Sequence, residues 1–118
     1  MAAKSGRRAG KAADQPPHRG RIQAQGGGIE KSVSWSRETP PTETEMMELV
    51  HKLELQLSRS ERLERHVGFE QLRRFIRRAA KEGGTSIVPS RSFPPRPKRG
   101  VRVDIEILTG MAAVPDKG

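Results

Sequence analysis

The stretch Val101-Arg-Val-Asp-Ile-Glu-Ile107 alternates branched apolar residues with charged residues. Successive side chains of a β-strand point to opposite faces of a sheet. The stretch therefore predicts a strand with one apolar face for a core and one polar face that carries Arg102, Asp104 and Glu106. On this pattern alone, these charges are either the solvated face of an ordinary antiparallel strand or the reactive groups of a site.

An N-terminal hairpin is predicted to join the same sheet. Residues 21–25 alternate polar and apolar side chains, and the alternation resumes over residues 29–36 after the glycines at 26–28. Glycines supply the positive φ values of a tight turn, and the patterns of nucleotide-binding glycine loops are absent. In the second arm Lys31 falls on the apolar side, and we interpret Trp35 as a core residue rather than a base-stacking platform.

Two capping boxes predict the starts of two helices, Thr42 with Glu45 and Ser58 with Glu61. Apolar residues follow each cap at helical spacing, and Gly83 is a natural end for the second helix. The predicted core positions are Met46, Leu49, Val50, Leu53 and Leu57 in the first helix and Leu63, Val67, Phe69, Leu72, Ile76, Ala79 and Ala80 in the second.

The chain divides into an arm and a single domain. Residues 1–19 are rich in Ala, Gly, Lys and Arg and predict a disordered basic arm. Residues 20–118 predict an α+β domain in which a small, mainly antiparallel sheet is packed by two α-helices. Residues 85–88 are a short β-prone run, residues 90–100 a basic extended loop, and residues 111–114 a last edge strand.

Positive charge dominates the 118 residues, which hold 23 Lys and Arg against 14 Asp and Glu for a formal net charge of +9. Such a chain is attracted to polyanions, meaning nucleic acid or an anionic membrane surface. The cations concentrate in the loop at residues 90–100 and on the second helix, where Arg74, Arg77 and Lys81 form a ridge facing away from its apolar stripe. Basic clusters of this kind are either binding surfaces or simply solvated faces.

Several classes of protein are excluded by what the composition lacks. No cysteine is present, which removes disulfides, thiolate catalysis and cysteine-containing zinc sites. No apolar run approaches the ~20 residues that a membrane-spanning helix needs, and no secretory signal is recognisable. His51 and His66 are interpreted as surface or boundary residues and His18 as incidental, so no zinc site is expected.

The candidate chemistry depends on which strand faces come together. If helices cover the apolar side of the sheet, the polar sides of its strands form one surface, and cations beside carboxylates on that surface suit strand scission of RNA. In a metal-independent reaction Asp104 or Glu106 is the candidate base, and Arg21, Lys31 and Arg102 are the candidate cations that stabilise the phosphorane. The acid would be a histidine or a protonated carboxyl group.

A metal-dependent route is the alternative for the same residues. Asp104 and Glu106 stand at i and i+2 of a strand and can share a Mg²⁺ ion. Leu108 stands where restriction-type nucleases have a lysine, so the metal-independent route is favoured and no cofactor is expected. The residues predicted to contact nucleic acid are Gln23, Gln25 and Ser34 in the hairpin, Arg74 and Arg77 on the second helix, and Arg96, Lys98 and Arg99 in the basic loop.

Four runs of this sequence resemble the C-terminal toxin domains of bacterial polymorphic toxins, in particular the type twenty-four class. The runs are Gly20-Arg-Ile-Gln-Ala-Gln-Gly26, Glu30-Lys-Ser-Val-Ser-Trp-Ser36, Thr39-Pro-Pro-Thr42 and Arg102-Val-Asp-Ile-Glu-Ile107. The likeness covers roughly residues 20–114. The positions that it highlights are Arg21, Gln23, Lys31, Ser34, Trp35, Arg102, Asp104 and Glu106.

The resemblance implies an effector of interbacterial competition that cleaves RNA in the cytoplasm of a target cell. Domains of this family lie behind large delivery proteins, and many are ribonucleases that a cognate immunity protein, here expected to be acidic, neutralises. The delivery region is missing from this sequence, so we expect a detached cassette or a fragment of a reading frame. Two alternatives stay open: a non-enzymatic RNA-binding protein, and a basic interaction module for an acidic partner protein.

Overall fold

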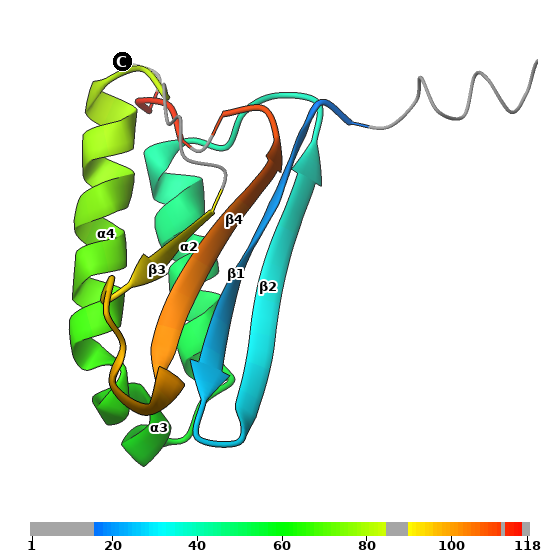
Figure 1. Cartoon of the computed structure of the whole chain (residues 1–118). Helices are drawn as coiled ribbons and strands as arrows, with labels where there is room; N and C mark the ends of the chain where they lie inside the picture. Colours follow the sequence, from blue (N-terminus) through cyan, green and yellow to red (C-terminus); the bar gives the residue numbers. More distant parts are fainter. Residues whose placement is uncertain (1–15, 85–89, 112, 117–118) are drawn as a thin grey trace, which may run out of the picture.

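The computed structural model describes residues 16–84, 90–111 and 113–116. A four-stranded antiparallel sheet in the order β2-β1-β4-β3 is covered on one face by helices (Figure 1). The α+β fold predicted from the sequence is thus confirmed. The elements in chain order are β1 (His18–Gly26), β2 (Ile29–Arg37), α2 (Glu43–Leu55), α3 (Arg59–Glu64), α4 (His66–Lys81), β3 (Ser90–Phe93), the 3-10 helix η1 (Lys98–Gly100) and β4 (Arg102–Thr109).

Strand β1 links the predicted hairpin to the predicted C-terminal strand. Ile22 at its centre lies opposite Val33 of β2 and opposite Ile105 of β4. Directly opposite residues of an antiparallel pair share a face, so the apolar sides of these strands coincide. Gly27 and Gly28 form the hairpin turn with φ values of 65° and 83°, which glycine adopts without steric cost.

The core lies between the sheet and the helices α2 and α4 (Figure 1). Trp35 is 6% exposed and packs over Gly20, where an added Cβ would lie 2.2 Å from Trp35 Cζ2. The interpretation of Trp35 as a core residue is therefore confirmed. The largest buried apolar side chains are Ile22, Trp35, Phe93, Val103 and Ile105 from the strands and Met46, Val50, Leu53, Phe69, Leu72 and Ile76 from the helices.

Both predicted capping boxes are present. The Thr42 side chain accepts a hydrogen bond from the Glu45 amide, while the Thr42 amide donates to Glu45 Oε1 at 2.9 Å. Ser58 and Glu61 form the same reciprocal pair, with the Ser58 amide donating to Glu61 Oε1 at 2.8 Å. These bonds satisfy amides that a helix leaves without internal partners, so the starts of α2 and α3 are encoded locally.

The second predicted helix is wrong as a single element, because the chain breaks at Arg65 into α3 and α4. Arg65 has φ −109° and ψ 15°, outside the helical range. The apolar stripe predicted across this point is wrong at its beginning, since Leu63 is 64% and Val67 57% exposed. Val67 precedes the buried Phe69 by two residues, about 200° around the helix, and the break turns Leu63 away from the face that α4 buries.

Several predicted boundaries also need correction. Strand β1 begins at His18, inside the predicted arm, whereas residues 1–15 lie outside the described part of the chain. The predicted loop at residues 90–100 begins with strand β3, which pairs with β4. In place of the predicted strand at residues 111–114, Val114 forms an isolated parallel bridge with Thr42. The β-prone run at residues 85–88 lies outside the described residues.

Candidate functional site

The strand register gathers the predicted polar residues on the face of the sheet that carries no helix. We call this surface the open face. Its residues form transverse rows, because residues opposite each other in neighbouring strands project to the same side. From β2 to β3 the rows are Ser34, Arg21, Glu106 and Ser90; then Ser32, Gln23, Asp104 and Ser92; then, from β2 to β4, Glu30, Gln25 and Arg102.

Arg21 and Glu106 form the most accessible ion pair of the open face. Arg21 Nε donates to Glu106 Oε1 at 2.7 Å, and the two side chains are 47% and 33% exposed. The guanidinium therefore has further N–H donors free to meet an anion from solvent. A carboxylate beside a cation, both on central strands, is an arrangement that can move a proton next to a bound phosphate.

Arg102 and Asp104 are less exposed and make more hydrogen bonds than Arg21 and Glu106. Arg102 Nε donates to both carboxylate oxygens of Asp104 at 3.1 and 3.0 Å, and its Nη2 donates to Gln25 Oε1 at 3.0 Å. Gln25 Nε2 in turn donates to Gln23 Oε1 at 3.1 Å. The Asp104 side chain is only 15% exposed. This chain of bonds positions side chains across β1 and β4, and it leaves Glu106 as the more accessible carboxylate.

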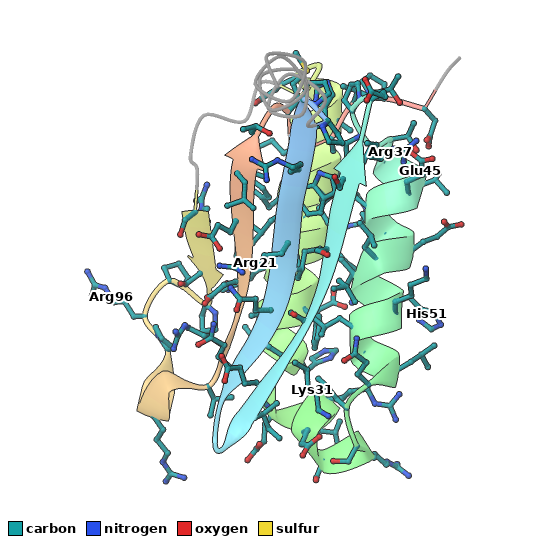
Figure 2. The ribbon with its side chains drawn as sticks, turned by 90° about the vertical axis from the view of Figure 1, so that its right-hand side faces the viewer. Arg21, Lys31, Arg37, Glu45, His51 and Arg96 are labelled. Carbon is teal, nitrogen blue, oxygen red and sulfur yellow. The ribbon has the colours of Figure 1, made fainter. Side chains whose placement is uncertain are left out.

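Lys31 does not belong to the open face. It lies opposite Ala24, which is fully buried on the helix-covered side of the sheet. Figure 2, which views the molecule from the β2 edge, shows Arg21 on the side of the sheet away from the helices and Lys31 toward the helix side. The candidate role of Lys31 as a cation beside Glu106 is therefore not supported by this geometry.

The predicted nucleic-acid contacts divide among separate surfaces. Gln23, Gln25 and Ser34 lie on the open face. Arg74 and Arg77 are exposed on α4, in the layer behind the sheet. The basic loop joins β3 to β4 and is tied to the open face where Arg102 Nη1 donates to the Gly100 carbonyl oxygen at 3.1 Å. Its exposed cations are Arg96, Lys98 and Arg99, of which Arg96 projects away from the body of the protein (Figure 2).

The open face carries as many carboxylates as guanidinium groups. Most of the positive excess of the described residues therefore lies elsewhere, on the outer side of α4 and in the β3–β4 segment. These are the two segments in which the sequence concentrates its cations. The positively charged residues of this face are Arg19, Arg21 and Arg102, and the negatively charged residues are Glu30, Asp104 and Glu106.

Histidine is absent from the open face, although a histidine was one of the predicted general acids. His51 is exposed on α2, with Nδ1 3.9 Å from Glu54 Oε1, and His66 is exposed at the start of α4. His18 begins β1, and its Nδ1 accepts a bond from the Met111 amide at 3.4 Å. The surface or boundary interpretation of His51 and His66 is confirmed.

The geometry of the carboxylates does not favour a metal ion. Within residues 16–84, 90–111 and 113–116, no group of three or more His, Cys, Asp or Glu side chains is arranged to hold one. Asp104 is occupied by Arg102 and Glu106 by Arg21, so a Mg²⁺ ion at this pair would have to displace a guanidinium from each carboxylate.

Ser90 and Ser92 belong to the open face but were absent from the sequence prediction. They lie opposite Glu106 and Asp104, and so extend two rows of polar side chains onto β3. The prolines that follow favoured a loop for the whole segment. The alternation in Ser90-Arg-Ser-Phe93, with Phe93 buried, is the signal that could have indicated a short strand.

Comparison with known proteins identifies no relative. No family model, no curated protein and no solved structure matches this chain. The resemblance of the hairpin and C-terminal strand to polymorphic-toxin domains therefore stays a prediction. None of the described helices has the length and apolar character needed to cross a membrane.

Proposed function

We propose that this chain is an RNA-cleaving effector domain of the polymorphic-toxin kind, with Arg21 and Glu106 at the centre of a metal-independent reaction. The observation that carries the proposal is the 2.7 Å contact between Arg21 Nε and Glu106 Oε1, made by two solvent-accessible side chains on adjacent central strands. A base and a phosphate-binding cation held by rigid strands are what hydroxyl-driven cleavage of RNA requires.

In the proposed reaction Glu106 takes the proton of a ribose 2'-hydroxyl. The 2'-oxygen then attacks the adjacent phosphorus, the bond from phosphorus to the 5'-oxygen breaks, and a 2',3'-cyclic phosphate is left. Arg21 donates its remaining N–H groups to the non-bridging oxygens, where negative charge grows in the transition state. The leaving 5'-oxygen takes its proton from water, since no histidine lies on the open face of the described residues.

The neighbouring polar residues would hold the RNA backbone rather than read its bases. Gln23, Ser32, Ser34, Ser90 and Ser92 supply amide and hydroxyl groups in the rows beside Arg21 and Glu106. Aromatic side chains, on which unpaired bases usually stack, are absent from the open face of the described strands. We therefore propose cleavage of RNA with little sequence preference.

The test compares Glu106→Gln with Glu30→Gln, because both remove one carboxylate from the open face. The purified full chain is incubated with single-stranded RNA and with DNA of the same sequence, in the presence of EDTA. We expect the wild type and the Glu30→Gln variant to cleave the RNA, and Glu106→Gln to lose at least about 100-fold in rate. Intact RNA with the wild type, or equal rates for both variants, would contradict the proposal.

A second candidate is an RNA-binding protein that does not cleave. The observation in its favour is that Glu106 and Asp104 are each paired with an arginine, as in an ordinary solvated sheet face. In that case RNA stays intact, and Glu106→Gln binds RNA at least as tightly as the wild type because a negative charge is removed. An electrophoretic mobility shift with intact RNA identifies this outcome.

The resemblance also supports an acidic immunity protein as partner. Such a protein would meet the exposed cations of the chain and, if it covers the open face, would block access to Glu106. Co-expression with a candidate acidic partner should then restore growth to cells that express the wild-type chain. This partner is expected only if the toxin proposal is correct.

A further inference from the structure

A second polar site lies at the β3 edge of the molecule, on the helix side of the sheet. A pocket of about 250 Å³ opens there between α4 and β3. We call it the edge pocket. Arg91 is paired with the buried Ile105, so its side chain leaves β3 on the helix side and not on the open face. The residues that matter for its chemistry are Gln71, Arg74, Phe75, Arg78, Arg91 and Phe93.

The lining of the edge pocket is basic and contains no acid. Arg74 and Arg78 stand one helical turn apart on α4, and Arg91 faces them from β3. None of these arginines forms an ion pair with a carboxylate among the described residues, in contrast to Arg21, Arg73 and Arg102. Their positive charges are therefore uncompensated at a concave surface, where an anion is attracted most strongly.

Two phenylalanine rings hold Arg91 in place. Its guanidinium carbon lies 5.4 Å from the ring centroid of Phe75 and 5.8 Å from that of Phe93. The two rings are 5.6 Å apart and tilted by 49°. Arg91 is exposed as a residue, so part of its side chain stays accessible beside these two cation–π contacts. This planar group is thus preorganised to bind a phosphate with its edge and to stack on a flat ring.

Gln71 adds a hydrogen-bond acceptor that has no partner within the described residues. Its Oε1 is shielded from solvent and accepts no bond there, although the residue itself is only partly buried. A shielded amide oxygen without a donor costs free energy, which favours a turn of the Gln71 side chain that brings Oε1 to a ligand N–H or O–H in the edge pocket. The edge pocket therefore combines cations for a phosphate, a flat surface for a ring and an acceptor for an N–H donor.

We propose that the edge pocket binds a single nucleotide, with the phosphate on Arg74, Arg78 and Arg91 and the base stacked on the Arg91 guanidinium. The Gln71 side chain turns on binding so that Oε1 accepts a hydrogen bond from the base. The nucleotide is either a free monophosphate or the terminal phosphorylated nucleotide of an RNA. The site is separated from Glu106 by the sheet, so the inference does not rest on the cleavage reaction proposed above.

The test is calorimetric titration of the full chain at low salt with AMP, adenosine and inorganic phosphate. Arg91→Gln and Arg78→Gln remove charges from the edge pocket, and Arg59→Gln removes one from the exposed surface of α3, outside the lining of the pocket. We expect AMP to bind the wild type more tightly than either adenosine or phosphate does. Each edge-pocket variant should lose about tenfold or more in affinity, whereas Arg59→Gln stays within about twofold.

A parallel titration with short RNA, in the Glu106→Gln background, distinguishes the two sources of the nucleotide. Preference for a 5'-phosphorylated over an unphosphorylated oligonucleotide, lost in Arg91→Gln, assigns the site to an RNA terminus. AMP binding without that preference assigns it to a free nucleotide. Equal losses in Arg91→Gln and Arg59→Gln, equal affinities for AMP and phosphate, or no binding of AMP and of phosphorylated RNA would overturn the inference. RNA cleavage by the wild type is measured separately and bears on neither result.

Discussion

Arg65 Nη2 donates a hydrogen bond to the backbone carbonyl oxygen of Gln25 at 3.1 Å. The two residues are 40 positions apart in the sequence, with α2 between them. Arg65 is 1% exposed, and its guanidinium also reaches the carbonyl oxygens of Glu61 and Gly26. The side chain of Gln25 meanwhile accepts a bond from Arg102 on the open face. A buried cation at the helix break is thus linked, through one residue of β1, to the polar network of the site.

Arg65→Met should destabilise the protein by about 3 kcal/mol or more. The substitution removes the donors to three partly buried carbonyl groups, and a group left unsatisfied costs about 1–3 kcal/mol. Urea unfolding followed by circular dichroism measures the effect. Arg59→Met, on the exposed surface of α3, is the matched control and should change stability by no more than about 0.5 kcal/mol. Equal stabilities of the two variants would contradict a structural role for Arg65.

Asp104→Asn should act differently from Glu106→Gln. Asp104 is held by Arg102 and only 15% exposed, so we expect a loss of stability of about 1 kcal/mol with a partial loss of RNA cleavage. Glu106→Gln disrupts an exposed pair that contributes about 0–1 kcal/mol, and it should abolish cleavage while the protein stays folded. Parallel unfolding and cleavage assays check this difference. Complete loss of cleavage in Asp104→Asn with full activity in Glu106→Gln would reverse the two roles.

Gly20→Ala should be severely destabilising. The added Cβ would lie 2.2 Å from Trp35 Cζ2 and 2.7 Å from the Glu106 carbonyl oxygen, and neither the buried ring nor the strand backbone can move without disturbing the core. We expect a cost of about 3 kcal/mol or more, at the upper end for overpacked sites. Unfolding monitored by the fluorescence of the single tryptophan measures it.

Gly83→Ala provides the comparison for that substitution. Gly83 has φ 75° and no atom within 4 Å of an added Cβ, so only backbone strain of about 1 kcal/mol is expected. If Gly20→Ala were as stable as Gly83→Ala, the close packing of Trp35 on β1 would be disproved.

Lowering the pH should weaken the ion pair between Glu45 of α2 and Arg37 of β2. The Thr42 amide, as the largest cause, and the Arg37 guanidinium lower the pKa of Glu45 below its ordinary value of 4.5. A carboxyl group whose pKa is lowered by folding stabilises the folded state above its unfolded pKa. That contribution is lost as the pH falls from about 4.5 through the lower folded value.

Thermal melts across this acidic range measure the effect. Glu45→Gln should flatten the fall in melting temperature below pH 4.5, because the titrating group is gone. Glu48→Gln removes a carboxylate of the same helix that forms no ion pair among the described residues, and its melting curves should follow those of the wild type. An unchanged slope in Glu45→Gln would contradict the assignment.

Much of the fold could be predicted because its signals are local. Alternation predicts a strand and its faces from backbone geometry alone, as at residues 101–107. A capping box needs only residues three apart, so Thr42 and Ser58 mark helix starts directly. The break at Arg65 has no comparable local signal, because it depends on a buried guanidinium meeting carbonyl groups of the distant hairpin turn. For the same reason the stripe was extended wrongly to Leu63 and Val67.

The candidate site was only partly predictable. Alternation assigned Arg21, Asp104 and Glu106 to polar strand faces, and it also put Lys31 on the apolar side of its strand, where the register places it. The sequence did not indicate which oppositely charged side chain each of these residues contacts. Arg21 and Glu106 are 85 residues apart in sequence, and their contact exists only because β1 pairs with β4 in one particular register.

The sequence by itself determined strands β1, β2 and β4, the polar side of each, and the starts of α2 and α3, because dihedral preferences, side-chain alternation and capping act over a few residues. Only the tertiary structure decided that Arg21 faces Glu106, that Arg102 binds Asp104 and Gln25, and that Arg91 turns toward Phe75 and Phe93. These contacts join segments far apart in the chain. Strand register and burial, which set their distances, follow from packing the whole core rather than from any single stretch.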